Sequence, residues 1–448
     1  MTYISTNPYT ETVIYRRDAE TLTTFKQTLA GLHAAQPTFA ALPIAERMAR
    51  LEALAQRIDA HKEQLATLIS EEVGRCLREC LAEVDKSIDL IRYYAKLAPE
   101  LLAHQTIPTQ ASLSQVRFEP LGVVLAVMPW NYPVWQILRF AIPAMCAGNA
   151  CLVKPAPSVG RVTEALFALV PEDLPFKATF LAHEDVPAAI AASDALAFTG
   201  SSETGRYLAG LAGQHLKKCV LELGGSNAVI VLPDADLRLA AVEACYSRYR
   251  DAGQSCNAAK RLIVADSVVD EFLVYFQEAA AQLVMGDPLA DSTSLAPLHT
   301  EAVRQRLHAQ VKDALDKGAI LLRGGYIPPG KGYFYPATII DQVNQDCRVY
   351  DEEVFGPVIS LLRAKDAAEA IRLANDTPFG LGASIYSENE AEAWLLAQQL
   401  QVGSVFMNRH TSSDLRLPFG GVKSSGFGRE LSEFGLYEFV NVKTYWQK

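Results

Sequence analysis

The chain has 448 residues, 50% of them hydrophobic and 21% charged, a composition that excludes an intrinsically disordered protein and allows two or three domains. The 41 basic and 51 acidic residues leave a net charge of -10, which argues against a broad nucleic-acid surface but not against a local basic pocket. The first residues lack a secretory signal, and no stretch of about 18 uninterrupted apolar residues follows. We therefore predict a cytoplasmic protein with no membrane span.

The predicted elements change in character along the chain. Apolar residues recur every three or four positions between residues 18 and 102, which predicts a helical region. From residue 116 onward, strand-like runs at 123–127, 151–153, 195–198 and 229–232 alternate with helical patterns such as 163–169 and 237–246. This alternation predicts a parallel sheet covered by helices.

A second alternating block covers residues 261–407, with strand candidates at 262–264, 358–362, 382–386 and 404–407. Two α/β domains account for this pattern better than one very large sheet. The run 437–446 is rich in β-forming residues and follows a glycine-rich stretch. An exposed strand there could pair with another subunit.

Cys256 in the segment GQSCNA is the most informative side chain, and it follows Glu222 in the segment LELGG. A thiol and a carboxylate in glycine-bearing turns suggest covalent catalysis with a separate base. The alternative for Cys256 alone is a small buried hydrophobic residue. The eight cysteines have no histidine partners at zinc-site spacing, so we predict no metal site.

Two polar side chains follow strand candidates of the first block. Asn131 stands between two prolines in PWNYP, where its amide could stabilise an oxyanion, although it could equally be a satisfied turn residue. Lys154 ends a strand candidate before Pro155 and Pro157. A ribose contact and a solvent-facing lysine are both compatible with that position.

Two further segments are weak signals on their own. FTGSSETG, with Gly200 and Ser201, follows a strand and opens a helix, which suits phosphate binding but also an ordinary helix cap. It lacks the GxGxxG spacing of the dinucleotide fingerprint. In DEEVFGP, Glu353 could hold a ribose while Phe355 packs against a planar ring, or the acids could simply be solvated.

Together these segments resemble the NAD(P)-dependent aldehyde dehydrogenase superfamily. PWNYP, LVKPA, FTGSSETG, LELGG, GQSC, EEVFGPV and PFGGVKSSG occur in the family's order over essentially the whole chain. The resemblance implies a Rossmann-type cofactor domain (1–111 and 124–224), an α/β catalytic domain (225–430) and a small β oligomerisation arm (112–123 and 431–448). We therefore expect a homo-oligomer.

The resemblance also implies the chemistry. Cys256 would attack the aldehyde, and the Asn131 amide and the Cys256 backbone N–H would hold the oxyanion of the thiohemiacetal. Hydride would pass to the nicotinamide of NAD or NADP, and water deprotonated by Glu222 would hydrolyse the thioester. The residues implied in cofactor binding are Trp130, Lys154, Pro157, Gly200, Ser201, Leu223, Glu353 and Phe355.

Three residues bear on the substrate. Arg139, Arg250 and Ser413 are arranged similarly to the carboxylate-binding set of succinate-semialdehyde dehydrogenases, and a guanidinium can hold a carboxylate through two hydrogen bonds. Arg139 and Arg250 could instead form structural salt bridges. Arg248 competes with Arg250, and the neighbouring hydroxyl residues Thr411 and Ser412 compete with Ser413.

The segment MPWNYPVWQ, together with Arg261, is similar to the short bacterial succinate-semialdehyde branch. We therefore expect oxidation of succinate semialdehyde to succinate. The alternatives are another acidic or short aliphatic aldehyde, such as glutarate semialdehyde, and a catalytically silent homologue.

Two positions depart from common family patterns. Pro157 stands where many NAD-preferring members have a glutamate that repels a 2′-phosphate, so the choice between NAD and NADP stays open. Ala258 replaces a cysteine found in some relatives, so a disulfide with Cys256 cannot form there. Overoxidation of the thiolate is then the more probable lesion.

Overall fold

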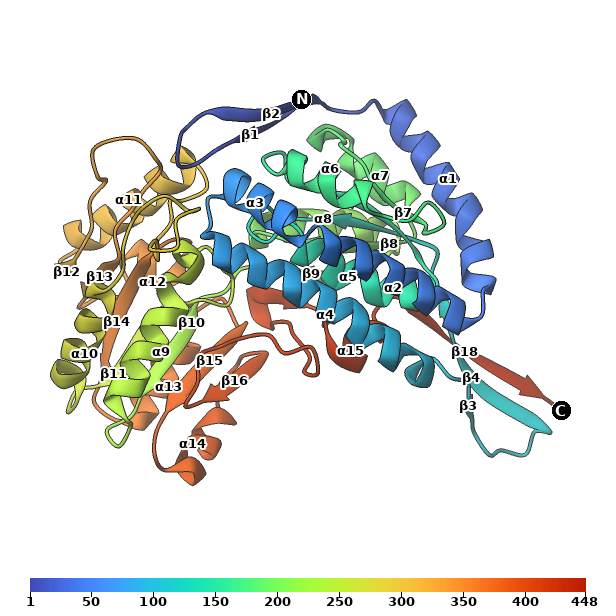
Figure 1. The fold of residues 1–448 in the computed structure, drawn as a ribbon. Coiled ribbons are helices and arrows are strands. Elements are labelled where there is room, and N and C mark those ends of the chain that lie inside the picture. Colours follow the sequence, from blue (N-terminus) through green and yellow to red (C-terminus); the bar gives the residue numbers. More distant parts are fainter.

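Two large β-sheets organise the computed structural model, which describes residues 1–448 (Figure 1). The first sheet has the strand order β17-β9-β8-β5-β6-β7, and the second has the order β12-β13-β14-β11-β10-β15-β16. A three-stranded sheet, β18-β4-β3, projects from the body as an arm. The predicted α/β fold class is confirmed.

The first sheet is parallel except for β17, which pairs antiparallel with β9. Its strands are β5 (Val123–Val127), β6 (Ala150–Lys154), β7 (Phe176–Ala178), β8 (Ala195–Thr199), β9 (Lys218–Glu222) and β17 (Gly426–Phe427). The connecting helices are α5 (Trp135–Cys146), α6 (Gly160–Ala168), α7 (Val186–Ala192) and α8 (Ser202–Gln214). β5 and β6 are buried almost throughout, as expected of parallel strands covered on both faces.

The predicted helical region forms four helices. They are α1 (Leu22–Ala41), α2 (Ile44–Ala60), α3 (Lys62–Val73) and α4 (Leu77–Leu101). The apolar positions that gave the helical period, including Leu51, Leu54 and Ile69, are buried. One core packs α2, α4 and α5 against one face of the first sheet, and α1, α7 and α8 share a smaller core on the other face.

An N-terminal hairpin was not predicted. β1 (Thr2–Thr6) pairs antiparallel with β2 (Val13–Asp18), and its Ile4 N–H donates to the Pro157 carbonyl at 3.0 Å. The hairpin therefore lies against the segment that follows β6. No helix is both long enough and apolar enough to cross a bilayer.

The second sheet is parallel except at β12, which runs antiparallel to β13. Its strands are β10 (Asn227–Val231), β11 (Ala259–Ala265), β12 (Ile320–Arg323), β13 (Thr338–Asp341), β14 (Val358–Ala364), β15 (Gly382–Tyr386) and β16 (Ser404–Met407). Its helices are α9 (Leu237–Tyr249), α10 (Val269–Ala281), α11 (Glu301–Asp316), α12 (Arg348–Asp351), α13 (Ala367–Asn375) and α14 (Glu390–Ala397). The sheet has its own large core.

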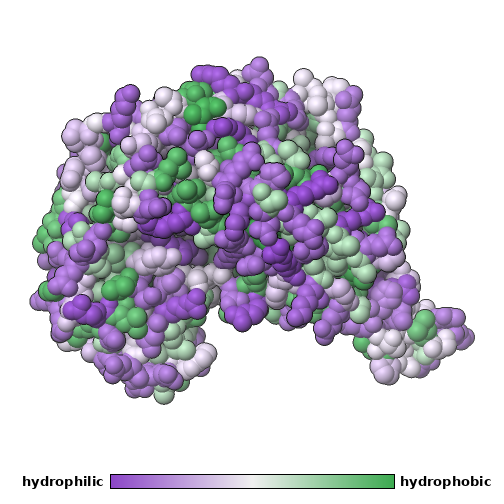
Figure 2. Space-filling model, in the orientation of Figure 1, coloured by the Kyte–Doolittle hydropathy of each residue, from purple (hydrophilic) through white to green (hydrophobic).

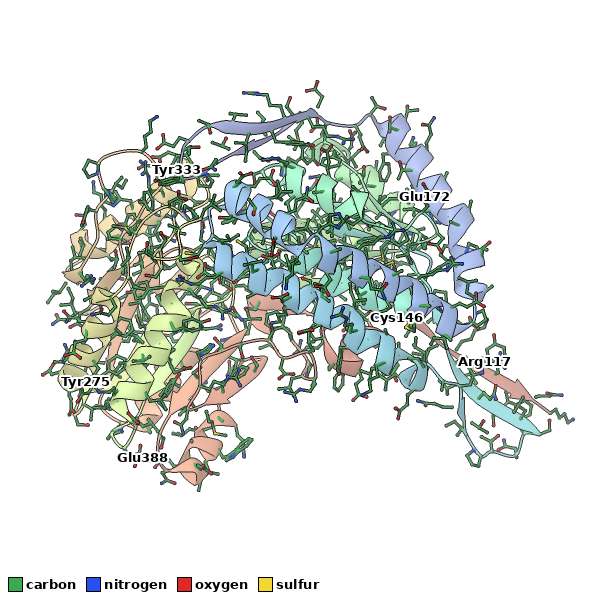
Figure 3. All side chains as sticks on the ribbon, viewed as in Figure 1. Arg117, Cys146, Glu172, Tyr275, Tyr333 and Glu388 are labelled. Atoms are coloured by element: carbon green, nitrogen blue, oxygen red, sulfur yellow. The ribbon has the colours of Figure 1, made fainter.

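The arm consists of β3 (Gln105–Thr106), β4 (Leu113–Pro120) and β18 (Val440–Gln447), and α15 (Ser432–Tyr437) precedes β18. Arg117 lies on the arm (Figure 3). Its guanidinium, on β4, lies 4.2 Å from the centre of the Tyr445 ring on β18. The β18 side chains Val442 and Trp446 are 61% and 52% exposed. The arm stands clear of the body and shows apolar patches among polar ones (Figure 2). The predicted domain boundaries stay a prediction.

Candidate active site

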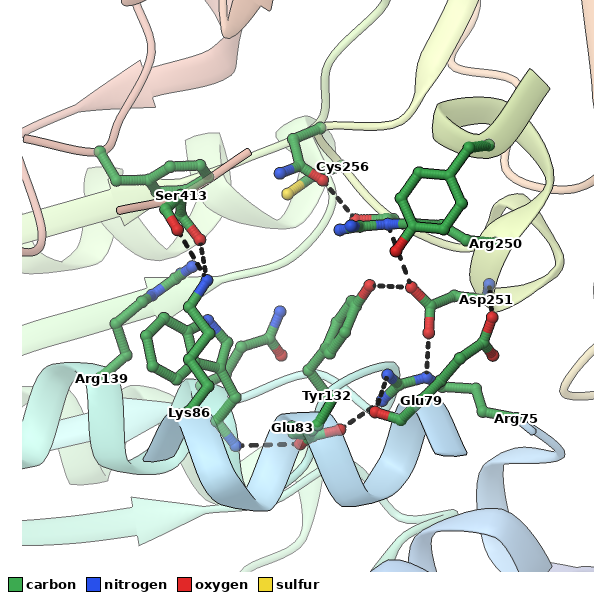
Figure 4. A pocket seen from close by; sticks show the side chains of 17 residues that line it. Arg75, Glu79, Glu83, Lys86, Tyr132, Arg139, Arg250, Asp251, Cys256 and Ser413 are labelled. Carbon is green, nitrogen blue, oxygen red and sulfur yellow. Dashed lines mark hydrogen bonds and ion pairs between the residues drawn. The ribbon is translucent and has the colours of Figure 1, made fainter. Parts of the chain in front are cut away.

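Two cavities meet at Cys256. The first, of about 180 Å³, lies beside α4 and α5 and includes Arg139, Arg250 and Ser413 in its wall (Figure 4). The second, of about 480 Å³, lies at the carboxyl ends of the strands of the first sheet and includes Glu222. Cys256 and Gln136 line both cavities, so the half-buried thiol can face a small molecule on one side and a larger one on the other.

A strained turn places Cys256. Asp251, Ala252 and Gly253 have φ angles of 54°, 50° and 72°, three successive residues in the left-handed region. For Asp251 and Ala252 this conformation is unfavourable and must be held by the surroundings. Gly253 is required because a Cβ atom there would collide with the Gly356 carbonyl.

A buried cluster of charges holds this turn. Arg75, between α3 and α4, pairs with Asp251 through Nε and Oδ1 at 2.6 Å and also with Glu83 of α4. The other Asp251 oxygen accepts a hydrogen bond from the Tyr132 hydroxyl. Burial alone would raise the pKa of Asp251, but Arg75 and Arg250 outweigh it and hold that pKa below its usual range.

The same cluster reaches the Asn131 loop. Arg75 Nη1 donates to the Asn131 carbonyl at 3.2 Å, and Glu83 accepts from the backbone N–H groups of Val134 and Trp135, each at 2.9 Å. Arg75 and Glu83 therefore connect the loop after β5 to the turn before Cys256. No sequence pattern singled out either residue.

The Asn131 side chain contacts the segment that leads into Cys256. Its Nδ2 donates to the Gln254 carbonyl at 2.9 Å, and its Oδ1 accepts from Gln136 Nε2 at 3.2 Å. Asn131 is buried and lines the second cavity, as Cys256 does. The structure therefore brings the predicted oxyanion donor and the predicted nucleophile together, and the donor's role stays a prediction.

The Cys256 thiol lies in a mixed electrostatic environment. Burial raises its pKa to about 11, although Lys260 and Arg139 act in the opposite direction. Lys260 Nζ donates to the Cys256 carbonyl at 2.6 Å and lies 3.2 Å from Glu353. At neutral pH the sulfur is protonated, so attack on a carbonyl needs a proton acceptor or added positive charge.

Glu222 is a buried carboxylate at the end of β9. Neither of its oxygens has a hydrogen-bond partner. Burial first, and the nearby Glu430 second, raise its pKa well above the usual range for glutamate. A buried carboxyl group without an ion-pair partner is suited to proton transfer.

Six of the predicted cofactor residues line the second cavity. They are Trp130, Gly200, Ser201, Leu223, Glu353 and Phe355. Ser201 caps α8 by accepting from the Thr204 N–H at 3.3 Å, and the helix N-terminus favours an anionic ligand. The size of the cavity, the N-terminus of α8 and the carboxylate of Glu353 fit a dinucleotide. Arg206 and Arg306 also line the cavity and were not predicted.

Lys154 and Pro157 lie outside the lining of this cavity. Lys154 is buried with its Nζ 5.5 Å from the ring of Tyr3, and the Pro157 carbonyl accepts from β1. Burial lowers the pKa of Lys154 to about 8. Their contacts with a cofactor stay a prediction.

The predicted substrate residues Arg139, Arg250 and Ser413 all line the first cavity. Arg139 is buried and pairs with Glu430, while Arg250 Nε lies 3.6 Å from Asp251. The competitors Arg248, Thr411 and Ser412 do not line this cavity. Arg248 donates to the Val354 carbonyl at 3.4 Å, and the buried Thr411 donates to the Asn257 carbonyl at 2.6 Å.

Comparison with known proteins agrees with this geometry. The model of the aldehyde dehydrogenase family matches residues 1–445. The chain belongs to the aldehyde dehydrogenase family. The family prediction is confirmed, and with it the prediction of an oxidoreductase that acts on aldehydes.

Individual relatives cover nearly the whole chain. An aldehyde dehydrogenase of Paenarthrobacter nicotinovorans is 41% identical, with 100% of both chains covered. The NAD(P)+ succinate semialdehyde dehydrogenase of Escherichia coli K12 is 41% identical over 90% of this chain and 88% of that protein. The crystal structure of succinic semialdehyde dehydrogenase from Streptococcus pyogenes with NADP+ is 33% identical, covers 99% of both chains and has a TM-score of 0.96.

The buried charge cluster predicts a large effect for Asp251→Asn. Removing this charge leaves Arg75 with one carboxylate fewer and releases the strained turn, so we expect a loss of about 3–5 kcal/mol in the free energy of unfolding. Urea unfolding measures this loss. Arg92→Met, which removes a surface pair with Asp59, serves as the control and should change little. Equal stability of the two variants would contradict the role of the cluster.

Proposed function

We propose that this aldehyde dehydrogenase oxidises an aldehyde with a terminal carboxylate, succinate semialdehyde in the first instance, to the dicarboxylic acid. The observation that carries the proposal is the cavity at Cys256. Its wall has four cations, Arg75, Lys86, Arg139 and Arg250, and three carboxylates, Glu79, Glu83 and Asp251. A carboxylate in a partly desolvated pocket needs such cations, whereas a neutral aldehyde does not. The Escherichia coli and Streptococcus pyogenes relatives are named for this substrate.

Cys256 and Asn131 act in the first half of the reaction. The Cys256 thiol first releases its proton to water, and the thiolate then forms a bond to the aldehyde carbon. The oxyanion that results is held by the Asn131 amide and the Cys256 backbone N–H. One hydrogen of the Asn131 amide donates to the Gln254 carbonyl, which leaves the second for the oxyanion. Apo side chains of this kind commonly tighten onto the reacting group only when substrate is bound.

Glu222 acts in the second half of the reaction. Its deprotonated carboxylate takes a proton from the water that attacks the thioester, and the C–S bond breaks to release the acid and return the thiol. The raised pKa of Glu222 makes its carboxylate a better base than an exposed glutamate. Overall, aldehyde, water and oxidised cofactor give acid, reduced cofactor and a proton.

NAD or NADP would occupy the second cavity, where Glu353, Phe355 and the N-terminus of α8 would hold it. When bound, the nicotinamide supplies the acceptor for the hydride that leaves the aldehyde carbon. Gly224 keeps room for Glu353, because a Cβ atom at Gly224 would collide with its carboxylate. With Pro157 in place of an acidic residue, the chain has no carboxylate there to exclude NADP.

A panel of aldehydes with both cofactors tests the proposal. We expect kcat/KM for succinate semialdehyde to exceed that for butanal, its neutral counterpart of equal carbon number, by about 10-fold or more. Cys256→Ala should abolish turnover with every aldehyde. Equal kcat/KM for the two aldehydes would contradict the acidic substrate class, and a higher value for glutarate semialdehyde would replace succinate semialdehyde as the substrate. No turnover with any aldehyde would favour the silent homologue.

We also propose that the arm joins subunits into a homo-oligomer. The outer edge of β18 has no partner strand within the chain, and Val442 and Trp446 expose large apolar side chains on one face of it. Unpaired edges of this kind are normally covered. The cytoplasmic location remains a prediction.

Light scattering tests the arm. The unaltered protein should be an oligomer at micromolar concentration, and Val442→Glu combined with Trp446→Glu should dissociate it, because charge replaces the apolar contact. Asn441→Glu, on the opposite face of β18, is the matched control and should leave the mass unchanged. A monomeric unaltered protein would contradict the proposal.

A further inference from the structure

Lys86 is a cation of the first cavity that the sequence patterns did not single out. It lies on α4, and its Nζ donates to the Ser413 carbonyl at 2.9 Å and to the Ser413 hydroxyl at 2.5 Å (Figure 4). The ammonium group also lies 4.6 Å from the centre of the Trp135 ring. Three elements far apart in the sequence therefore position this one charge.

Lys86 differs from the other cations of the cavity in its partners. Arg75 pairs with Glu83 and Asp251, Arg139 pairs with Glu430, and Arg250 lies 3.6 Å from Asp251. Lys86 has no carboxylate within ion-pair distance and contacts only neutral groups and an aromatic ring. It is the charge in this wall that an anionic ligand would neutralise.

We propose that Lys86, acting with the Ser413 hydroxyl, is the principal anchor for the carboxylate of the substrate. The inference rests on the proposed function, because it takes the acid-terminated aldehyde as the ligand. Arg139, which stays paired with Glu430, and Arg250, which lies 3.6 Å from Asp251, then shape the potential of the cavity.

The hydrogen-bond inventory supports this pair. An ammonium group has three donors, and Lys86 uses two of them on Ser413, so one is available. The Ser413 oxygen accepts from Lys86, and its own hydrogen has no acceptor in the protein. Lys86 and Ser413 can therefore donate together to the two oxygens of one carboxylate.

The electrostatics act in the same direction. Burial, with repulsion from Arg250 and Arg139, lowers the pKa of Lys86 to about 8, although the Asp414 carboxylate acts in the opposite direction. A bound carboxylate would stabilise the charged form of Lys86 further. Recruiting Arg139 instead would require separating a buried ion pair from Glu430, which is costly.

Substitution of Lys86 tests the anchor. In Lys86→Met we expect kcat/KM for succinate semialdehyde to fall about 10- to 100-fold, mainly through KM, while the value for butanal changes less than about threefold. Lys86→Arg should restore part of the loss. Lys96→Met removes an exposed lysine from the same helix and should match the unaltered protein.

A second measurement needs no turnover. The carboxylate 4-hydroxybutanoate, which is not an aldehyde, should slow alkylation of Cys256 by iodoacetamide in the unaltered protein. It should lose this effect in Lys86→Met. The neutral alcohol 1-butanol should protect Cys256 in neither protein. Acid preference and protection that survive in Lys86→Met would overturn the anchor alone. An unaltered protein without acid preference would overturn the substrate class and the anchor together.

Discussion

The active site depends on one buried ion pair, between Arg75 and Asp251. Asp251 begins a turn whose left-handed backbone is unfavourable by itself, and this turn carries the chain to Cys256. Arg75 also contacts the Asn131 carbonyl and pairs with Glu83, which accepts from the start of α5. These charges therefore hold the turn before Cys256, which belongs to the second sheet, against the loop that carries Asn131 in the first sheet. Cys256 and Asn131 are brought together by electrostatics as well as by packing.

This arrangement explains how one thiol serves two ligands. Cys256 lies where the cation-lined cavity meets the cavity at the strand ends, and Glu222 lines the second of these. Burial raises the pKa of both Cys256 and Glu222, so it disfavours the charged form of each group. The reactivity of both groups therefore depends on the ligands that enter the two cavities.

The sequence predicted those parts of the site that belong to local patterns. Lys154 ends a strand as expected, and Ser201 caps the helix that was predicted to follow it. Lys86 was missed because a lysine on an amphipathic helix looks the same in sequence whether it faces solvent or a cavity. Lys86 faces the cavity because a distant loop brings Ser413 next to α4, and the local sequence does not show this contact. The N-terminal hairpin that covers Lys154 is likewise a long-range contact with no local signal.

The central claim is that Cys256 forms the covalent bond to substrate and that Glu222 is needed to break it. The most direct test mixes Glu222→Gln protein with succinate semialdehyde and oxidised cofactor, quenches with acid within one turnover, and determines the mass of the protein and of its peptides. The account predicts one succinyl group per chain on the peptide that contains Cys256, and none in the double variant with Cys256→Ala. An acyl group on another residue, or none at all despite formation of reduced cofactor, would contradict it.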